Sequence, residues 1–300
     1  MGAEIRRYDK TEEIRVQKKF VIYSAMVGAY DDILQPLVTD DRFDYILFSN
    51  EIKESAVGVW QVRPIAYHNP DNTRICRYVK THPEKLVPGY EASVWMDSNV
   101  RIMTPYLYQR VNELFEEGVL FSSMWHPCRR DIYEEAFAVM NMMVEHESVV
   151  VDWCHRLRRE KFPPQSGLCE TDVMYRKHNG CLTSETDELW WHCIDNYSRR
   201  DQLSYTYALW KKGIPVHYMF GEGFNVRNTE YLKLVMHKDM RHNHCPIAKN
   251  EAWLMRHCWK HKEDKQKIAE VYYRLYGRLF PKFWIAIAGQ YYRLIDRIKG

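Results

Sequence analysis

The alternation of apolar and polar positions predicts strands and helices that follow one another along most of the chain. Runs of β-branched and aromatic residues between turn formers indicate strands, and apolar residues that recur every three or four positions indicate helices. The predicted strands are residues 20–30, 43–50, 59–67, 93–102, 119–126, 172–178 and 214–220. The predicted helices are residues 31–38, 72–87, 104–117 and 131–160, with two more within 185–212.

Strands that alternate with helices are typical of an α/β fold, in which a mostly parallel sheet is flanked by helices. We therefore expect one α/β domain at residues 20–246, after a polar leader at 1–19. From residue 247 to residue 300 the pattern is helical throughout, which predicts a helical C-terminal tail.

The overall composition favours a soluble globular protein over a nucleic-acid-binding one. Hydrophobic residues make up 46% of the 300-residue chain and charged residues 28%, as in soluble globular proteins. A net charge of +3 is too small to favour a nucleic-acid-binding protein, but it leaves anionic small molecules and lipid headgroups as candidate partners.

The sequence shows no targeting signal. Its polar start lacks the apolar segment of a signal peptide, and no apolar run reaches the ~18 residues that span a bilayer. The eight cysteines form no C-x-x-C pair, so we expect reduced thiols. These features predict a cytoplasmic protein.

The first candidate site is the polar interruption of the strand 93–102, where a buried apolar run stops at Asp97, Ser98 and Asn99. In an open α/β sheet, ligands bind at the carboxyl ends of strands. The hard oxygens of Asp97 and Asn99 suit Mg²⁺ or Mn²⁺, which can keep open positions for a substrate diphosphate. The alternative is a simple turn in which both side chains cap backbone N–H groups.

A cationic series forms the second candidate site. Arg74, Arg77 and Lys80 recur at every third position of the predicted helix 72–87, which places them along one side of it. Guanidinium groups bind phosphate or carboxylate oxygens well. The series therefore indicates either an anion-binding surface or a solvated basic helix face.

The third candidate site is the pair Asp201 and Gln202, which follows two arginines and precedes an apolar helical run. One interpretation is an acid–amide pair that faces a cleft, where it would bind sugar hydroxyls or stabilise developing positive charge. The other is a helix N-cap, with Ser198 or Asp201 near the positive end of a helix.

Histidine and cysteine are concentrated at residues 236–261. Their spacing fits no tight zinc-finger pattern, so we do not expect a structural zinc site. We expect instead that one histidine of this segment joins the metal at Asp97.

Two segments, 126–135 and 167–179, place charged residues directly beside predicted strands. His126, Arg129 and Glu170 from these segments could line a cleft for an acceptor substrate. The alternative is a set of surface salt bridges.

Taken together and in this order, these segments resemble a known family. The resemblance is carried by VIYSAMVGAYDD, DYILFSN, RICRYVK, SVWMDSNV, HPCRRDIYEEA, GLCETDVMYRKHN, RRDQLSY and MHKD. They are similar to a glycosyltransferase-like domain shared by bacterial polysaccharide-cluster proteins and by plant proteins linked to pectin mucilage and to an alkaline ceramidase. The resemblance covers about residues 20–240 and rests on the colinear set of segments, not on one motif.

The resemblance implies a GT-A-like fold for residues 20–246 and a hexosyltransferase-like activity that uses a nucleotide-diphosphate sugar as donor. A turn from Val27 to Asp31 would bind the nucleotide, and the cationic series would bind the diphosphate or the donor sugar. The implied nucleotide-sugar-binding residues are Val27, Gly28, Tyr30, Asp31, Arg74, Arg77, Lys80 and Asp97.

The resemblance also implies a divalent cation, Mn²⁺ or Mg²⁺ with Mn²⁺ favoured, at a D-x-D-type motif. That motif is Asp97-Ser98-Asn99 here, and His237 matches a late histidine that completes the metal site. The amide of Asn99 is a weaker ligand than a carboxylate. We therefore expect a cation that is held less tightly or is partly replaced by arginines.

Asp201 and Gln202 resemble an Asp-Gln pair that lies beneath the donor sugar in some retaining transferases, which implies catalytic roles for both and favours retention of the anomeric configuration. The physical chemistry agrees. A cation and arginines would stabilise the leaving diphosphate, and a nearby carboxylate would support the positive charge that develops on the sugar.

The implied setting is surface polysaccharide synthesis, with a glycan or lipid-linked acceptor. Residues 271–300 mix aromatic residues and Ile with Arg and Lys, so this tail could lie on an anionic membrane as a peripheral contact at its inner face. The alternative is a pair of helices packed on the main domain.

Two other functions remain open at this point. A metal-dependent hydrolase would need a richer set of His and Asp ligands than Asp97 and Asn99 provide. A non-catalytic nucleotide- or glycan-binding module could use some of the ten Trp and 21 Tyr residues to stack on sugars.

Overall fold

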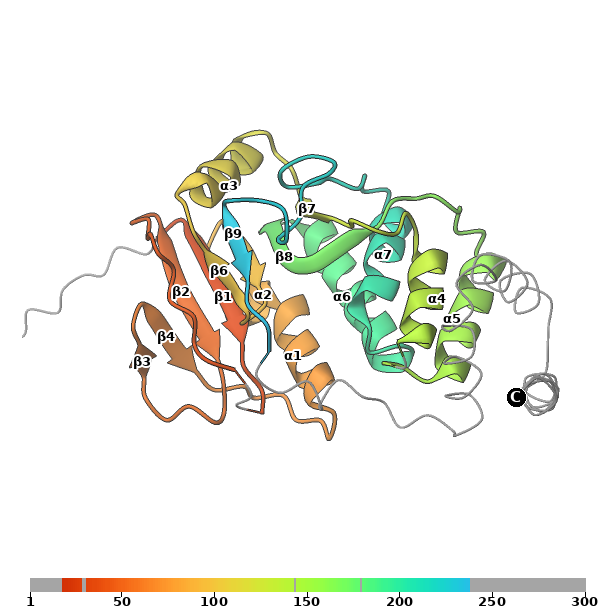
Figure 1. Ribbon diagram of the computed structural model, residues 1–300, viewed down its shortest axis with the longest axis horizontal. Coiled ribbons are helices and arrows are strands. Elements are labelled where there is room, and N and C mark those ends of the chain that lie inside the picture. Colours follow the sequence, from red (N-terminus) through yellow and green to blue (C-terminus); the bar gives the residue numbers. More distant parts are fainter. Residues whose placement is uncertain (1–17, 29–30, 143, 179, 238–300) are drawn as a thin grey trace, which may run out of the picture.

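A seven-stranded sheet forms the centre of the protein (Figure 1). The computed structural model describes residues 18–28, 31–142, 144–178 and 180–237. The predicted helical tail at 247–300, Tyr30 and most of the predicted leader at 1–19 lie outside these described residues.

The strand order in this sheet is β3-β4-β2-β1-β5-β8-β7. The strands are β1 (Phe20–Ala25), β2 (Phe43–Phe48), β3 (Ala56–Val57), β4 (Trp60–Arg63), β5 (Ala92–Met96), β7 (Phe121–Trp125) and β8 (Cys169–Lys177). Strands β4, β2, β1 and β5 pair in parallel, whereas β3 and β8 run in the opposite direction. Strand β7 pairs antiparallel with β8 and so runs with β5 again. The sheet is mixed but mostly parallel, which confirms the predicted fold class.

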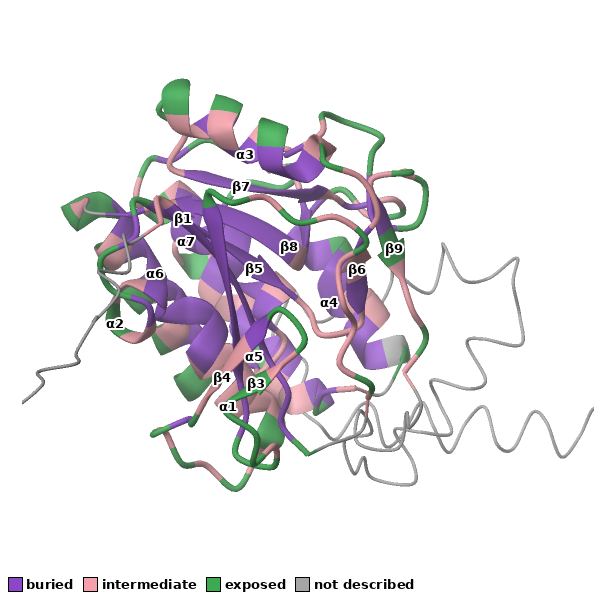
Figure 2. Ribbon diagram, turned by 90° about the vertical axis from the view of Figure 1, so that its left-hand side faces the viewer, coloured by how far each residue is buried: buried purple, intermediate pink, exposed green. Residues whose placement is uncertain are grey.

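Helices cover both faces of the sheet (Figures 1 and 2). They are α1 (Asn72–Thr81), α2 (Pro83–Leu86), α3 (Tyr106–Glu116), α4 (Ile132–Asn141), α5 (Glu147–Arg159), α6 (Cys181–Asn196) and α7 (Tyr205–Lys211), with a 3-10 turn, η1 (Asp201–Leu203), before α7. One face packs against α3 and a small sheet of β6 (Val100–Ile102) and β9 (Leu232–Leu234). The other packs against α1, α6 and α7. No helix within the described ranges is both long and apolar enough to cross a bilayer.

Alternation along the strands builds a separate hydrophobic core on each face. In β1, Phe20 and Ile22 join the core beneath α3, whereas Val21 and Tyr23 join the core beneath α1 and α6. Every residue of β1 is buried, as expected for a parallel strand that is covered on both sides. Because both faces are covered, a ligand can reach the sheet only at its edges.

The predicted strand 93–102 forms as two strands that belong to different sheets. Strand β5 ends at Met96, and the backbone then turns so that Val100 N donates to Asp97 O at 2.9 Å. Strand β6 follows and pairs antiparallel with β9, not with the main sheet. The polar interruption at Asp97 to Asn99 therefore marks the corner where the chain leaves the central sheet.

Two predicted elements are wrong. Residues 31–38 form no helix, because Pro36 interrupts the segment and the carbonyl groups of Leu34 and Gln35 accept hydrogen bonds from side chains of distant residues. Residues 214–220 run beside β7 but share only one bridge with it, at Tyr218, since Pro215 lacks the backbone donor that a ladder needs.

The predicted helix 131–160 forms as two helices, α4 and α5. The break between them contains Glu145, whose Oε2 accepts hydrogen bonds from Ser198 Oγ at 3.0 Å and Arg199 N at 3.1 Å. The interruption thus supplies a carboxylate that fixes the loop before η1. The two helices predicted within 185–212 are confirmed as α6 and α7.

A fully buried arginine joins the centre of the sheet to α6. Arg176 of β8 donates from Nη1 to the carbonyl of Lys80 and to Tyr23 Oη, and its Nε lies 3.1 Å from Asp187 Oδ1. A buried guanidinium needs such a partner because desolvation of a charge without compensation is costly.

Asp187→Ala should lower the free energy of unfolding by about 3–5 kcal/mol, because it leaves Arg176 charged and buried without its carboxylate. Glu188→Ala is the matched control, since Glu188 is half exposed and pairs with the exposed Lys85. It should cost less than about 1 kcal/mol. Urea unfolding followed by tryptophan fluorescence measures both, and equal losses would contradict the structural role of Asp187.

Candidate active site

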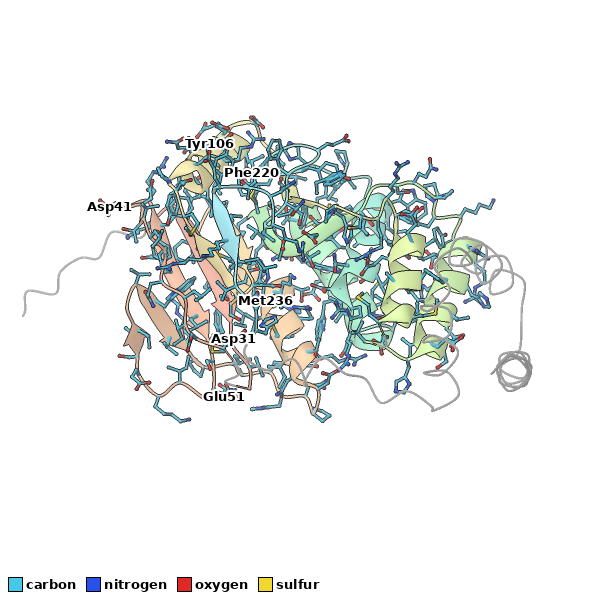
Figure 3. All side chains as sticks on the ribbon, in the orientation of Figure 1. Asp31, Asp41, Glu51, Tyr106, Phe220 and Met236 are labelled. Atoms are coloured by element: carbon cyan, nitrogen blue, oxygen red, sulfur yellow. The ribbon has the colours of Figure 1, made fainter. Side chains whose placement is uncertain are left out.

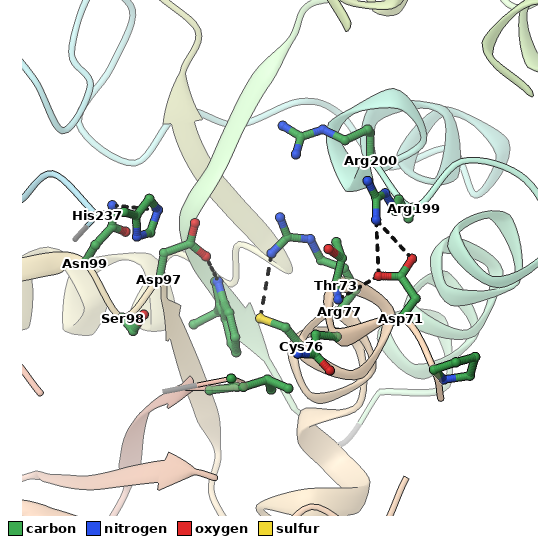
Figure 4. Close-up of a pocket in the computed structure, with 16 residues that line it drawn as sticks. Asp71, Thr73, Cys76, Arg77, Asp97, Ser98, Asn99, Arg199, Arg200 and His237 are labelled. Carbon is green, nitrogen blue, oxygen red and sulfur yellow. Dashed lines mark hydrogen bonds and ion pairs between the residues drawn. The ribbon is translucent and has the colours of Figure 1, made fainter. Parts of the chain in front are cut away.

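A cavity of about 630 Å³ opens at the carboxyl ends of β1 and β5, beside the N-terminal half of α1 (Figure 4). It is lined by Ala25, Val27, Gly28, Pro70, Asp71, Asn72, Thr73, Cys76, Arg77, Trp95, Asp97, Ser98, Asn99, Arg199, Arg200 and His237. This edge is where α/β sheets bind their ligands. Several residues singled out in the sequence thus share one cavity.

Asp97 is fixed at the corner after β5 by its own backbone and by a neighbouring indole. Its N–H donates to Asp172 O at 2.8 Å, and its Oδ1 accepts from Trp95 Nε1 at 2.7 Å. Trp95 is fully buried, so this contact holds the carboxylate in one orientation. The other carboxylate oxygen remains available to a ligand in the cavity.

Asn99 and His237 are brought together by the small sheet. Strand β9 pairs with β6, and the backbone pairing extends past both strands, because Val235 N donates to Asn99 O at 2.8 Å. Asn99 Nδ2 donates to Val235 O at 3.0 Å and lies 3.3 Å from His237 Nε2. The sequence pattern did not predict β9, yet this strand places His237 beside the Asp97 corner.

These donors fit a divalent cation that is also bound by a substrate. No three His, Cys, Asp or Glu side chains among the described residues are grouped as a metal site by themselves. Mg²⁺ and similar ions commonly use one or two carboxylates and take their remaining ligands from water and substrate phosphates. Asp97, the amide oxygen of Asn99 and His237 suit that kind of incomplete site.

Cationic side chains line the other side of the cavity (Figure 4). Arg199 pairs with Asp71 Oδ1 at 3.3 Å, and Asp71 also caps α1 by accepting from Thr73 N. The backbone N–H of Arg200 donates to Ser198 Oγ at 3.1 Å, but its guanidinium forms no hydrogen bond or ion pair with the side chain of any other described residue. Partial burial and the nearby Arg77 lower the pKa of the Arg200 guanidinium, so a bound anion would favour its charged form.

Asp201 lies behind the cavity wall, not on it. It is almost fully buried, with Oδ1 3.1 Å from Arg77 Nε and Oδ2 2.6 Å from Lys80 Nζ, and it also accepts from Thr171 Oγ1 at 2.9 Å. Burial alone would raise the pKa of Asp201, but Arg77 and Lys80 outweigh this and hold it well below its usual range. Asp201 is therefore ionised and positions two cations. Its neighbour Gln202 donates to Cys169 O at 3.3 Å.

An irregularity in β8 makes this arrangement possible. The pairing with β7 skips from Met174 to Glu170, so the intervening residues of β8 bulge away from their partner strand. In that bulge Thr171 reaches Asp201, and the carbonyl of Asp172 reaches the backbone of Asp97. The bulge thus connects the two halves of the site.

The cationic series of α1 divides into three environments. Arg77 lines the cavity, but Arg74 does not: it pairs with Asp71 Oδ2 at 3.1 Å and donates to Tyr197 O. Lys80 is fully buried below the cavity, with Nζ 3.7 Å from Asp97 Oδ1. Lys80 therefore links Asp97, at the corner after β5, to Asp201.

The expected nucleotide-binding turn is represented by Val27 and Gly28, which both line the cavity. Gly28 has a φ of +97°, a conformation that favours glycine, and its N–H donates to Glu51 Oε1 at 3.1 Å. Asp31 does not line the cavity. It faces His237 instead, with Oδ2 2.5 Å from Nδ1.

The expected acceptor-binding residues do not line this cavity. They form a neighbouring group in which Arg129 pairs with the buried Glu135, and Glu170 pairs with Arg227. His126 accepts two backbone hydrogen bonds at Nδ1, and burial together with Arg129 lowers its pKa to about 3. These side chains remain candidates for an acceptor cleft.

Sequence reasoning did not assign Arg199 and Arg200 to the site, although both stand directly before Asp201. The available signal was that two arginines directly precede an acid at the start of an apolar helical run. Asp71 was also missed, because its role as a helix cap that pairs with Arg199 depends on contacts across 128 residues.

The search of solved structures found similar folds in several glycosyltransferases. Mouse xyloside xylosyltransferase 1 in its apo form has 10% identity and a TM-score of 0.40, over 68% of this chain and 84% of that one. The WbbM bifunctional glycosyltransferase has 12% identity and a TM-score of 0.38, over 72% and 40%. The galactosyltransferase LgtC with donor and acceptor sugar analogues has 10% identity and a TM-score of 0.39, over 88% and 98%.

The sequence comparisons give a clearer result. A search of curated proteins found no significant match. The family model described as "TOD1/MUCI70, glycosyltransferase-like domain" matches residues 1–237, which include every residue that lines the cavity. This confirms the family that the sequence segments resemble: the chain belongs to the TOD1/MUCI70 family of glycosyltransferase-like domains.

Proposed function

We propose that the protein transfers a sugar from a nucleotide-diphosphate sugar to a glycan or lipid-linked acceptor, assisted by a divalent cation. The observation that carries this proposal is one cavity with Asp97 and Asn99 on one side and Arg77 and Arg200 on the other (Figure 4). The first side offers oxygen ligands to a cation, and the second offers guanidinium groups to an anion. A diphosphate with its bound cation can use both sides at once.

The balance of charge around the cavity supports an anionic ligand. Among the cations that line it, Arg199 is paired with Asp71 and Arg77 is paired with Asp201. Arg200 lacks such a carboxylate partner among the described side chains. A diphosphate bound there would gain charge-assisted hydrogen bonds from a planar donor that suits phosphate oxygens.

The chemistry follows from the bond that must break, which joins the anomeric carbon of the sugar to a diphosphate oxygen. Negative charge grows on the diphosphate as this bond breaks, and Arg77 and Arg200 would stabilise it because they are already oriented. A bound Mn²⁺ or Mg²⁺, held by Asp97, Asn99 and His237, would supply Lewis-acid stabilisation of the same charge.

Asp201 is proposed to act through the cations that it holds. A carboxylate whose pKa is kept low is a poor proton acceptor, so Asp201 does not suit the role of general base toward the acceptor hydroxyl. Together with the resemblance of Asp201 and Gln202 to an Asp-Gln pair in retaining transferases, this favours retention. Asp201 would orient Arg77 toward the diphosphate.

The biological setting is also a proposal. Surface polysaccharide synthesis at the inner face of a membrane would suit a lipid-linked acceptor. The tail that would contact anionic lipids lies outside the described residues. Among the alternatives, no specific contact in the described residues favours a hydrolase, and a binding module would differ from a transferase only in lacking turnover.

The deciding experiment measures thermal stability of the full-length protein with a panel of nucleotide-diphosphate sugars, each with and without Mn²⁺. A cognate donor should raise the melting temperature by mass action, and more so with Mn²⁺. The same donor should be slowly hydrolysed to nucleoside diphosphate. Stabilisation without any release would indicate a binding module, and neither effect with any donor would refute the proposal.

Asp97→Ala should reduce donor turnover to background, because it removes the carboxylate at the cation site. Its fold should persist, since Asp97 lies at a corner, its main-chain contacts do not require the side chain, and the buried Lys80 keeps its closer carboxylate partner, Asp201 at 2.6 Å. Asp195→Ala is the matched control, because Asp195 is an exposed carboxylate on α6, away from the cavity. Its loss should leave turnover unchanged. Release of nucleoside diphosphate is the measurement, and activity retained by Asp97→Ala would remove this residue from the mechanism.

Asp201→Asn should lower kcat by about 100-fold, with a smaller change in KM, because Arg77 and Lys80 would lose the anion that orients them. The variant should also be less stable, since Lys80 is fully buried, and kinetics are therefore measured well below its melting temperature. An unchanged kcat would confine Asp201 to a structural role.

Arg200→Gln should weaken the binding of inorganic diphosphate by about 10- to 100-fold, the effect of losing one charge-assisted contact. Arg74→Gln is the matched control, because Arg74 is a nearby cation that does not line the cavity. Isothermal titration calorimetry compares the two variants with the wild type. If Arg74→Gln had the larger effect, the assignment of the anion-binding side would be incorrect.

A further inference from the structure

The ring of His237 is held between two side chains from distant parts of the chain. Its Nδ1 lies 2.5 Å from Asp31 Oδ2, and its Nε2 lies 3.3 Å from Asn99 Nδ2. Figure 3 shows Asp31 close to Met236, the residue before His237. The contact spans 206 residues and brings the segment after β1 to the segment after β9.

The contact with Asp31 determines which nitrogen of His237 carries a proton. A carboxylate only accepts hydrogen bonds when ionised, so Nδ1 must be the N–H donor at 2.5 Å. In the neutral ring this leaves the lone pair on Nε2, the atom that faces Asn99 and the cavity. This lone pair faces the Asn99 amide nitrogen at 3.3 Å, and a neutral imidazole with its lone pair on Nε2 is the form that binds a metal ion through that atom.

Asp31 is poorly placed for the nucleotide contact that the sequence suggests. Only 6% of its side chain is exposed, and it does not line the cavity. His237 lines the cavity, and the Asp31 carboxylate contacts the ring nitrogen of His237 that is farther from Asn99. Metal-binding histidines usually donate their second N–H to a carboxylate or carbonyl group in this manner, and loss of such a partner weakens metal binding.

We propose that Asp31 is a positioning residue for the divalent cation: it holds His237 with Nε2 directed toward the cation site at Asp97 and Asn99. This inference rests on the cation assigned under the proposed function. It gives Asp31 a role in the affinity for the cation and none in direct contact with the donor. Since Val27 and Gly28 line the cavity from the same segment of chain, it also links the nucleotide side of the site to the cation side.

The experiment measures Mn²⁺ binding to the full-length protein by electron paramagnetic resonance of the free ion, with no donor present. Asp31→Ala should weaken Mn²⁺ binding by about 10- to 100-fold. Asp31→Asn should have a smaller effect, because its amide oxygen can still accept from Nδ1. Asp32→Ala is the matched control: the neighbouring carboxylate is exposed, and its loss should leave the affinity unchanged.

A double-mutant cycle tests whether Asp31 acts through His237. If it does, Asp31→Ala should add nothing to the loss caused by His237→Ala, because the residue it positions is already absent. Additive losses, or an unchanged affinity in Asp31→Ala, would overturn the inference and leave the proposed cation intact. A wild-type protein that binds no Mn²⁺ without donor would overturn this inference, whereas the nucleotide-sugar panel with and without Mn²⁺ decides the proposed function separately. Melting temperatures identify unfolded variants, and Asp31→Asn keeps the test open if Asp31→Ala does not fold.

Discussion

The site depends on the burial of one charge, the ammonium group of Lys80. This side chain is fully buried beneath the cavity, with Nζ 2.6 Å from Asp201 and 3.7 Å from Asp97. An ammonium group in the interior is tolerable only with a carboxylate beside it, and Asp201 is the closer of the two. The carbonyl of the same residue accepts from Tyr23 and Arg176, so β1 and β8 are tied to this point as well. Lys80 thus joins the acidic corner after β5 to the loop that carries the arginines.

Much of the fold could be predicted from the sequence because the central strands are buried on both faces and read as continuous apolar runs. The errors have a common cause in tertiary contacts. The segment 31–38 has helix-forming residues, but its carbonyl groups are used by Trp60 and Arg101. Strand β9 is only three residues long and forms because β6 pairs with it, so no local sequence pattern predicts it.

The candidate site was predicted in part, and helix geometry explains where the prediction failed. A step of three residues rotates a side chain by about 60° relative to the previous one, so Arg74, Arg77 and Lys80 fan out over roughly 120°. Arg77, in the middle, faces the cavity, whereas its neighbours turn toward Asp71 and toward the interior. Arg200 could not be identified in advance, because its role follows from a loop held by Glu145 across 54 residues.

The pairing of β6 with β9 sets the order in which the site can be completed during synthesis. The ribosome produces the central sheet and its helices long before residue 237, and most of their core contacts involve residues made by then. The corner at Asp97 and Asn99 must wait for β9 and the residues directly after it, which end at His237, the final residue matched by the family. A nascent chain can therefore hold a largely formed sheet while the corner at Asp97 and Asn99 is still open.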